Sequence, residues 1–447
     1  MNRFSTRYRC PVFVLALGLA WSLATAELSA QFVQQAIGGI AVDAEGVVQA
    51  PTVEDEAALA KMRESALAEV PEDLQAFTDV RAVSLKQLEA EVAKHLAEGS
   101  ELPESVRYLA GLQRVKYVFV YPEQNDVVIA GPAEGWRVDR LGNVVGATTG
   151  RPVLLLEDLV VALRTRDVEQ LEAISCSIDP TPAGMQRLRG VMRRIQSMGD
   201  PEQTMTTMEE ALGPQVVTVT GVPQSSHFAR TMVAADFRMK RLAMGFDASP
   251  VGDMPSFMEM LASSRGSTSA TPRWWLAPKY EPLAKDAAGL AWELRGQGVQ
   301  CLTEEDHFNA AGIRQSSSKA GAAATAWANK FTERFNELAD HDSSFGSLRN
   351  AMDLAVVAAL IDKQGLLDKA GLTLPELTHA LALSEYYAPR QVNSQANFVR
   401  RRNDFVVSAS GGVQLIPWTV ADEIEEVAAV GDVRAKLAAP SGNWTWQ

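Results

Sequence analysis

The chain has 447 residues, enough for two or three domains of ordinary size. Hydrophobic residues make up 47% of it and charged residues 22%, a composition that is typical of globular proteins and excludes wholesale disorder. The 42 Lys and Arg residues against 55 Asp and Glu residues give a formal net charge of −13. This balance argues against nucleic acid or an anionic membrane surface as the main partner, because both require a basic footprint.

Residues 1–30 have the features of a cleaved export signal. Three arginines precede an apolar run over residues 11–24, and small residues at 24–26 and 28–30 offer two cleavage sites. The run is too short to span a bilayer comfortably, so we expect cleavage rather than anchoring. The best later apolar stretch contains Asp353, so the mature chain is expected to have no membrane span. These features predict an exported protein of the periplasm, the cell surface or the medium.

Residues 31–60 are predicted to form a flexible leader with one short hairpin. Val42 and Asp43 are followed by Gly46, an order that suits a tight turn with glycine in the left-handed region. The same G-x-x-V-D-x-x-G phrase recurs at Gly135, with Asp139 in the place of Asp43. Two explanations of the repeat are open: either a module of two strands was duplicated, or the two segments independently use the same residues to form a tight turn.

Residues 61–200 are predicted to form an N-terminal α+β unit. Leu85, Leu88 and Val92 recur at helical spacing. Two strand-like runs over 116–123 and 126–132 then predict an antiparallel hairpin. Two further helices are expected, separated by a proline-containing break, and they cover residues 153–174 and 183–198.

Residues 205–430 are predicted to form a larger C-terminal α+β unit, followed by a tail over 431–447. Its expected elements are a strand over 214–223, a helix or helix-to-strand segment over 227–246, strands over 273–283, 289–296 and 298–305, a helical pair at 322–362, and a final hairpin over 405–418 that turns at Gly411 and Gly412. The predicted fold class is therefore α+β, with antiparallel hairpins, small sheets and packed helices in two units.

Several phrases resemble a family of secreted planctomycete proteins known only as a domain of unknown function. They are KYVFVYPEQNDVVIAGPAEGW, ADFRMKRLAMGF, RWWLAPKYEPL and WANKFTERFNELADHDSSFGSLRNAMDLAVVAALI, together with the SGG phrase near the C-terminus. The resemblance covers most of the mature chain. It implies export and an α+β build of several parts, and it carries no activity, ligand or catalytic residue.

The standard catalytic signatures are missing from the sequence. It contains no phosphate-binding P-loop, no H-E-x-x-H helix and no G-x-S-x-G nucleophile elbow. Ser316 and Lys319 have the S-x-x-K spacing, but the partner motifs of the penicillin-binding enzymes are absent. No spacing of His and Cys predicts a metal site, and no motif identifies a cofactor.

The strongest local candidates for catalysis are His227, Asp236 and Lys240. An imidazole, a carboxylate and an amine in one cleft are suited to proton transfer. The plainer interpretation is an amphipathic helix on which Asp236 and Lys240 form one exposed ion pair. His307 and His341 also adjoin acidic residues, but they would form a site only if the fold brought them together.

Trp274, Trp275 and Tyr280 are the candidate binding residues. Neighbouring residues on a strand point to opposite faces, so one indole can lie in the core while the other is exposed. An exposed indole suits stacking on a sugar ring or anchoring at a protein interface, whereas the alternative is that protein covers both. Cys176 and Cys301 are the two cysteines of the mature chain, and they form either one disulfide or two buried thiols.

These observations support three hypotheses for function. The first is an exported, non-catalytic protein that binds an envelope protein or polysaccharide or builds the cell envelope. The second is an exported hydrolase with an unrecognised site. The third is a carbohydrate-binding module that uses Trp274 or Trp275.

Overall fold

A computed structural model describes most of the chain. The described residues are 36–37, 39–51, 70–165, 173–194, 200–263, 272–308, 314–316, 320–399, 405–407, 409–437 and 444–446. The predicted export signal lies outside them. The fold is α+β, as predicted from the sequence.

The larger of the two main sheets, sheet A, has ten strands and mixed topology. The pairs β11–β19 and β3–β16 are parallel, and the other paired strands are antiparallel. In spatial order the strands are β1 (Ala36–Ile37), β2 (Ile40–Val42), β3 (Val47–Gln49), β16 (Gln391–Val392), β10 (Gln215–Thr220), β9 (Ile174–Asp179), β19 (Ser410–Leu415), β11 (Pro272–Lys279), β14 (Gly298–Phe308) and β15 (Arg314–Ser316).

The second main sheet, sheet B, has seven strands and contains the hairpin predicted over 116–132. In spatial order its strands are β20 (Ile424–Glu426), β12 (Leu283–Lys285), β13 (Ala291–Glu293), β5 (Tyr117–Tyr121), β6 (Asp126–Ala133), β4 (Thr78–Ser84) and β21 (Thr445–Trp446). Two-stranded sheets are formed by β7 (Trp136–Val138) with β8 (Val144–Gly146) and by β17 (Asn397–Val399) with β18 (Phe405–Val407).

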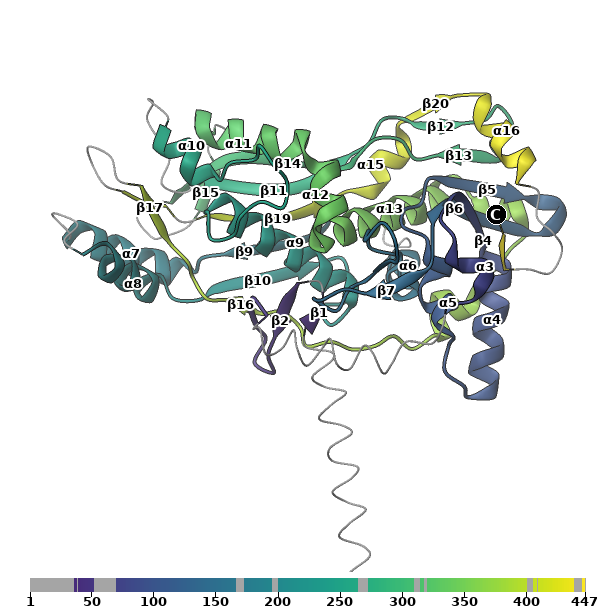
Figure 1. The fold of residues 1–447 in the computed structure, drawn as a ribbon, viewed down its shortest axis with the longest axis horizontal. Coiled ribbons are helices and arrows are strands. Elements are labelled where there is room, and N and C mark those ends of the chain that lie inside the picture. Colours follow the sequence, from purple (N-terminus) through teal and green to yellow (C-terminus); the bar gives the residue numbers. More distant parts are fainter. Residues whose placement is uncertain are drawn as a thin grey trace, which may run out of the picture.

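The two predicted units share both sheets. Strand β9 precedes the boundary predicted at 200–205, yet it pairs with β10 and β19 beyond that boundary. Strands β12 and β13 lie in the connection between β11 and β14, and β13 pairs with β5 of sheet B. The chain therefore leaves sheet A after β11, contributes two strands to sheet B, and returns as β14 (Figure 1).

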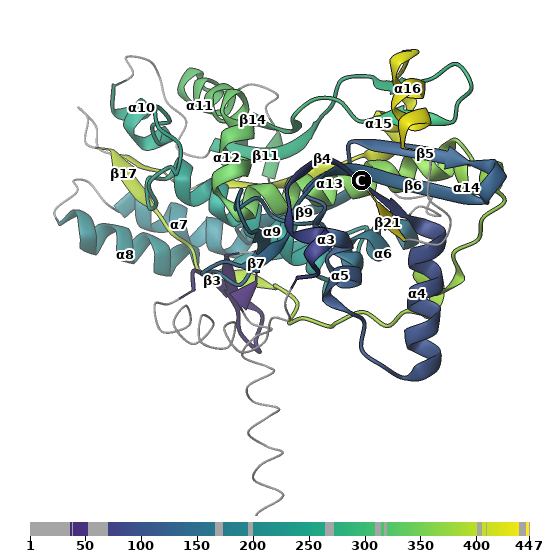
Figure 2. The same cartoon turned by 45° about the vertical axis from the view of Figure 1, so that its right-hand side comes forward.

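Helices cover one face of sheet A and both faces of sheet B. The core of sheet A includes residues of α9 (His227–Ala243), α10 (Phe257–Ser263), α11 (Ala322–Glu333), α12 (Phe335–His341) and α13 (Ser343–Lys363). The main core of sheet B includes residues of α4 (Leu85–Glu98), α6 (Leu156–Thr165), α13 and α14 (Leu366–Ala370), while α16 (Ala429–Lys436) packs on its other face (Figure 2). The other α-helices of the described residues are α3 (Glu72–Gln75), α5 (Glu104–Arg107), α7 (Pro182–Arg194), α8 (Pro201–Leu212) and α15 (Pro417–Asp422).

Helix α13 joins the two cores. Phe345 and Met352, in its first half, are buried in the core of sheet A, and Val356 and Leu360 in its second half are buried in the core of sheet B. Among the described residues it is the one helix long and apolar enough to cross a membrane by length and composition, and 94% of that apolar window is buried inside the structure. It is therefore packed as an interior helix, consistent with its apolar residues lying all around its circumference.

The capping residues explain where the long helices begin. The Ser226 hydroxyl accepts a hydrogen bond from the Ala229 amide at the start of α9, and the Asp342 carboxylate accepts one from the Ser344 amide at the start of α13. The predicted helical pair at 322–362 is present as α11 and α13, with the short helix α12 between them.

The glycine pair near the C-terminus lies within a strand, so the turn predicted at Gly411 and Gly412 is wrong. Both residues belong to β19, between β9 and β11. A Cβ atom on Gly411 would lie 1.7 Å from the Trp274 carbonyl oxygen, and one on Gly412 would lie 2.1 Å from that of Cys176. Glycine is needed here because the neighbouring backbones approach closely, not because the chain reverses.

The repeated G-x-x-V-D-x-x-G phrase forms the same turn twice. Asp43 accepts a hydrogen bond from the Val47 amide at 2.8 Å, and Asp139 accepts one from the Asn143 amide at 2.9 Å. Gly46 and Gly142 both have positive φ. The first hairpin, β2–β3, extends sheet A, whereas β7–β8 forms a sheet of its own, so the shared turn sits in two different surroundings.

Candidate functional site

One face of sheet A is open along its central strands. Alternate residues of β10 are buried and exposed, and alternate residues of β9 are buried and half-buried. The inward side chains, such as Ile178 and Val219, pack in the core that α9 and α13 complete. The outward side chains of these strands face away from that core, so sheet A has a covered face and an open face.

A row of five aligned residues crosses the open face. The strand registers pair Thr218 with Ser177, Ser177 with Gly412, Gly412 with Trp275, and Trp275 with Leu302. Directly paired residues point to the same face of a sheet. Thr218 and Leu302 are exposed, and Trp275 is half-buried. The row therefore has the hydroxyl groups of Thr218 and Ser177 at one end and the side chains of Trp275 and Leu302 at the other, with Gly412 between them.

A groove of about 390 Å³ lies on the open face, between strands β19, β11 and β14 and helix α15. The α15 wall follows directly from β19, because Pro417 starts the helix two residues after the strand ends. Both hydrophobic and polar side chains line the groove. Its lining comprises Trp275, Ala277, Pro278, Lys279, Tyr280, Gln300, Leu302, Gln414, Ile416, Thr419, Val420 and Glu423.

Two of the lining side chains are held in place by hydrogen bonds. The Gln300 amide donates to the Pro278 carbonyl oxygen at 2.9 Å, and the Tyr280 hydroxyl donates to Asp353 at 2.7 Å. Asp353 is in turn held by two hydrogen bonds from the Arg114 guanidinium, at 2.8 and 3.0 Å. Burial and the Asp353 charge raise the pKa of Tyr280. The Tyr280 hydroxyl is thus directed to the buried Asp353, and its ring is held in place in the lining of the groove.

Trp274 and Trp275 point to opposite faces of β11. Trp274 is fully buried, and its ring centroid lies 5.0 Å from that of Phe257 and 4.9 Å from that of Trp327. Its indole N–H donates to the Ala324 carbonyl oxygen at 3.3 Å. Trp274 is therefore a core residue, and the binding role predicted for it is corrected; Trp275 and Tyr280 remain candidates because both line the groove.

Asp236 and Lys240 form a buried ion pair, not the exposed pair that their spacing on a helix suggests. The Lys240 ammonium donates to Asp236 at 3.0 Å and to the Ile178 carbonyl oxygen of β9 at 3.1 Å. Burial raises the pKa of Asp236, and the Lys240 charge opposes that shift. The pair is buried because this side of α9 lies directly on the covered face of sheet A. A charged pair fixed against two strands is suited to holding the helix in place.

His227 belongs to a different cluster. It lies nine residues before Asp236, which is about 13 Å along the helix axis and half a turn around it. Its Nδ1 atom lies 2.9 Å from the Asp158 carboxylate. Burial by itself would lower the pKa of His227, but the Asp158 carboxylate outweighs burial and raises that pKa to about 9. The three predicted catalytic residues are therefore not assembled into one site.

The cluster around His227 also contains Arg230, which lies near it in the sequence, and Glu157 and Tyr386, which no sequence pattern singled out. The Tyr386 hydroxyl donates to Glu157 at 2.9 Å, and the Arg230 guanidinium lies 5.4 Å from the centroid of the Tyr386 ring. Burial raises the pKa of Glu157. These residues come from α6, α9 and the loop before β16, so no local motif could have grouped them. The arrangement ties that loop to the two helices.

The remaining predicted sites are not assembled among the described residues. His341 ends α12, and the side chain of His307 lies outside the described residues, as does Lys319 of the S-x-x-K spacing. Within the part of the chain that the structure describes, no group of three or more His, Cys, Asp and Glu side chains is placed to hold a metal ion.

Cys176 and Cys301 are both free and buried. The registers place them in one row, with Val413 and Leu276 between them on the two intervening strands. Three strand spacings separate their Cα atoms by about 14 Å. A disulfide requires Cα atoms within about 7 Å, so of the two alternatives for this pair the structure has the two thiols.

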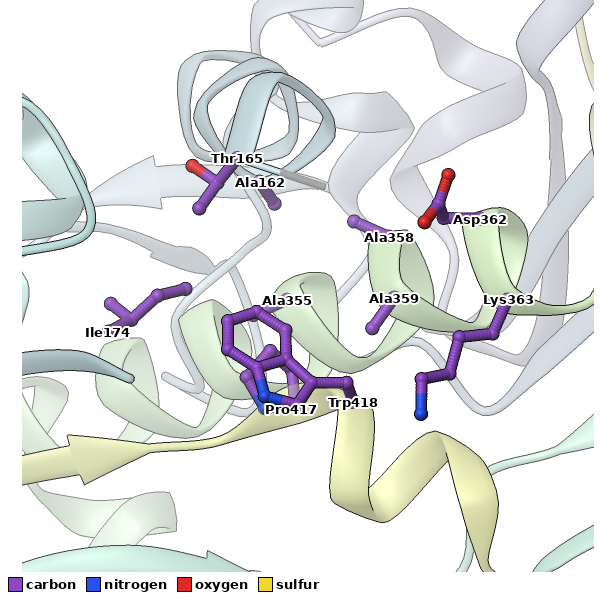
Figure 3. A pocket seen from close by; sticks show the side chains of 10 residues that line it. All are labelled: Ala162, Thr165, Ile174, Ala355, Ala358, Ala359, Asp362, Lys363, Pro417 and Trp418. Atoms are coloured by element: carbon purple, nitrogen blue, oxygen red, sulfur yellow. The ribbon is translucent and has the colours of Figure 1, made fainter. Parts of the chain in front are cut away.

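A second cavity of about 230 Å³ lies between α6, α13 and α15 (Figure 3). Ala355, Ala358 and Ala359 of α13 form one wall, and Trp418 of α15 faces them. At its rim, the Lys363 ammonium pairs with Asp422 at 2.5 Å. This cavity is mainly apolar, whereas the groove combines aromatic rings with the convergent polar groups that fix a ligand's orientation. The groove is therefore the candidate functional site.

Comparison with known proteins identifies one family for part of the chain. Residues 176–257 match the model of a family described as "Protein of unknown function (DUF1598)". This agrees with the predicted resemblance to a domain of unknown function, and it carries no activity. The matched segment begins within β9 and contains the whole of β10 and α9, whereas Trp275 and the groove lie beyond it. No curated protein and no solved structure matches the chain at a significant level.

Proposed function

We propose that the protein is exported and binds a neutral polysaccharide in the groove of sheet A without cleaving it. The observation that carries this proposal is the position of Trp275, which is half-buried on the open face with the amides of Gln300 and Gln414 lining the same groove. The order of charged, apolar and small residues over 1–30 supports export.

The groove has the chemistry that a sugar requires. A sugar ring has apolar C–H faces that pack on an aromatic side chain and a rim of hydroxyl groups that need hydrogen-bond partners. Trp275 offers an apolar ring with a polar edge. The side chains of Gln300 and Gln414 offer both donors and acceptors, and the Thr419 hydroxyl, which donates to the Ile416 carbonyl oxygen at 2.8 Å, offers an acceptor. Trp275 therefore provides the stacking surface and these three residues the hydrogen-bonding partners.

The lining of the groove favours binding over hydrolysis. Glycosidases typically use two carboxyl groups on either side of the scissile bond. Among the described residues that line the groove, Glu423 is the single carboxylate. The Glu423 carboxylate can accept hydrogen bonds from sugar hydroxyls. It lacks the second carboxyl group that the usual mechanisms of glycoside cleavage need.

Affinity electrophoresis of the purified mature chain tests this proposal. The gels contain laminarin, xyloglucan or galactomannan, and insoluble cellulose and chitin are tested by co-sedimentation. We expect at least one polysaccharide to retard the protein and Trp275→Ala to weaken that binding by roughly tenfold, the factor equivalent to 1.4 kcal/mol.

Trp418→Ala is the matched control, because Trp418 is also half-buried but lines the other cavity. Its binding should equal that of the unmodified chain. Equal weakening by both substitutions would overturn the assignment to the groove. Absence of binding to all five polysaccharides would overturn the proposed function, and release of reducing sugar from the bound one would replace it with hydrolysis.

A further inference from the structure

We infer that the binding surface continues from the groove across β9 and β10, so that its ligand is an extended chain of several sugars lying across the strands. This inference rests on the proposed function and specifies the ligand. It follows from the alignment of polar residues on the open face beyond the groove.

Hydroxyl groups continue the surface without a break. Gln414 lines the groove and pairs with Ser175 of β9, which pairs with Thr220 of β10. The Ser175 and Thr220 hydroxyls lie 2.8 Å apart. In the adjacent row, Ser177 pairs with Thr218, and Gly412 separates Ser177 from Trp275. Four hydroxyl groups thus extend the line of the groove's polar side chains.

The length of this surface exceeds what a single sugar needs. The row from Leu302 to Thr218 crosses five strands, and four strand spacings amount to about 19 Å. The groove occupies only the β19–β11–β14 part of that row. A ligand confined to the groove would leave the hydroxyls of β9 and β10 unused, whereas a longer chain would reach them.

The charges beside the row favour a neutral ligand. Arg273 of β11 donates to Asp179 of β9 at 2.9 Å and lies 3.6 Å from Glu304 of β14. These opposite charges compensate one another along one border of the row. Thr218, Ser177, Gly412, Trp275 and Leu302 carry no formal charge. An acidic polysaccharide would find no concentration of positive charge there, while a neutral chain would find hydroxyls and an indole.

The test is the dependence of affinity on chain length, measured by titration calorimetry. The probes are cello-oligosaccharides and N-acetylglucosamine oligomers of two to six units. We expect affinity to rise from the dimer to the longer oligomers and then to level off. The double variant T218V/T220V keeps β-branched side chains on β10 but removes two exposed hydroxyls. It should weaken binding of the six-unit oligomer by roughly fivefold or more, because the loss of one hydrogen bond lowers affinity by about fivefold. Binding of the two-unit oligomer should not change.

Thr206→Val is the matched control, because Thr206 is exposed on α8 away from the sheet face. It should bind all oligomers like the unmodified chain. Equal affinities for the disaccharide and the hexasaccharide, with Trp275→Ala still weakening both by roughly tenfold, would overturn the extended surface and leave the proposed function intact. Failure of every oligomer and polysaccharide to bind would overturn both. If two copies of the protein associate and T218V/T220V abolishes that association, the open face would be assigned to a second copy of the chain instead.

Discussion

The covered and open faces of sheet A use neighbouring residues for opposite purposes. On β11, Trp274 is surrounded by Phe257 and Trp327, while Trp275 lines a groove. On β9, the buried Ile178 adjoins Ser177, which lies on the open face. Strand geometry separates the residues into two sets, and the helices determine which set is buried. The covered face stabilises the fold, and the open face carries the proposed binding surface.

The polar groups of the two faces differ in the same way. On the covered side, Lys240 donates to Asp236 and to the Ile178 carbonyl oxygen, so its hydrogen bonds are directed inward. On the open side, Thr218, Thr220 and Gln414 are exposed. A polar group whose hydrogen-bonding partners lie inside the protein contributes to the structure. An array of exposed polar groups bonds water instead, and it can exchange that water for a ligand.

The largest expected contrast is between the two tryptophans. Trp274→Ala should lower the free energy of unfolding by about 3–5 kcal/mol, because it opens a cavity in an aromatic core. Trp275→Ala should lower it by about 1 kcal/mol, because water fills the space left by a half-buried side chain. Urea denaturation measures both values. Similar losses for the two variants would contradict the assignment of Trp275 to an open face.

The next largest effect concerns the ion pair of Asp236 and Lys240, which is buried on the covered face. Asp236→Ala should lower the free energy of unfolding by roughly 3 kcal/mol, because Lys240 is left as a buried, uncompensated charge. That value is at the lower end of the range of about 3–5 kcal/mol that is usual when one partner of a buried ion pair is removed. The reason is that the Ile178 and Gly411 carbonyl oxygens still accept hydrogen bonds from the Lys240 ammonium. The control is the double variant D236L/K240M, which removes both charges and should be clearly more stable than Asp236→Ala. Equal stability of the two variants in urea denaturation would show that the pair is not buried.

A smaller effect should appear as a pH dependence of stability at the start of α9. Asp158 raises the pKa of His227 in the folded chain to about 9, above the ordinary value of 6.5. The protonated imidazole therefore contributes stability in full below about pH 6.5, and that contribution is lost as the pH rises towards 9. Thermal unfolding at pH 6, 7.5 and 9 should show this loss. His227→Gln removes the titrating group, and in that variant the decline between pH 6 and 9 should be reduced; an unchanged decline would assign it to other groups.

The smallest expected effect is that of reducing agent. Because Cys176 and Cys301 lie too far apart to bond, reduction should leave the melting temperature unchanged. Burial raises the pKa of both thiols, so a thiol reagent should modify them only after denaturation. A lower melting temperature after reduction, or a Cys176–Cys301 peptide in mass spectrometry, would contradict the strand order of sheet A.

Local patterns in the sequence predicted many elements correctly. The spacing of Leu85, Leu88 and Val92 indicated the helix that forms α4, and the alternating runs over 116–132 indicated the β5–β6 hairpin. Long-range pairing was harder to predict. Ile174–Asp179, placed partly in a helix and partly in a break, is a central strand of sheet A because β10 and β19 both bond to it.

The candidate site could be predicted only in part. Because neighbouring residues on a strand point to opposite faces, the sequence named Trp274 and Trp275 as candidates, but it did not determine which of the two is exposed. Gln300 and Gln414 also occupy outward positions of strands, but on separate strands more than a hundred residues apart, so no sequence pattern linked them. The proposed grouping of His227 with Asp236 and Lys240 failed because nine residues of helix separate a buried cluster from a buried pair.

The sequence by itself determined many of the helices and strands, including α4 and the β5–β6 hairpin, and that Trp274 and Trp275 point to opposite faces of β11. These properties depend on neighbouring residues and are therefore visible in the linear order. Only the tertiary structure decided which face of sheet A the helices cover, that Asp236 and Lys240 are buried, and that the cysteines lie three strands apart. Each of these depends on the pairing of segments distant in the chain, and that pairing is set by the packing of the whole molecule.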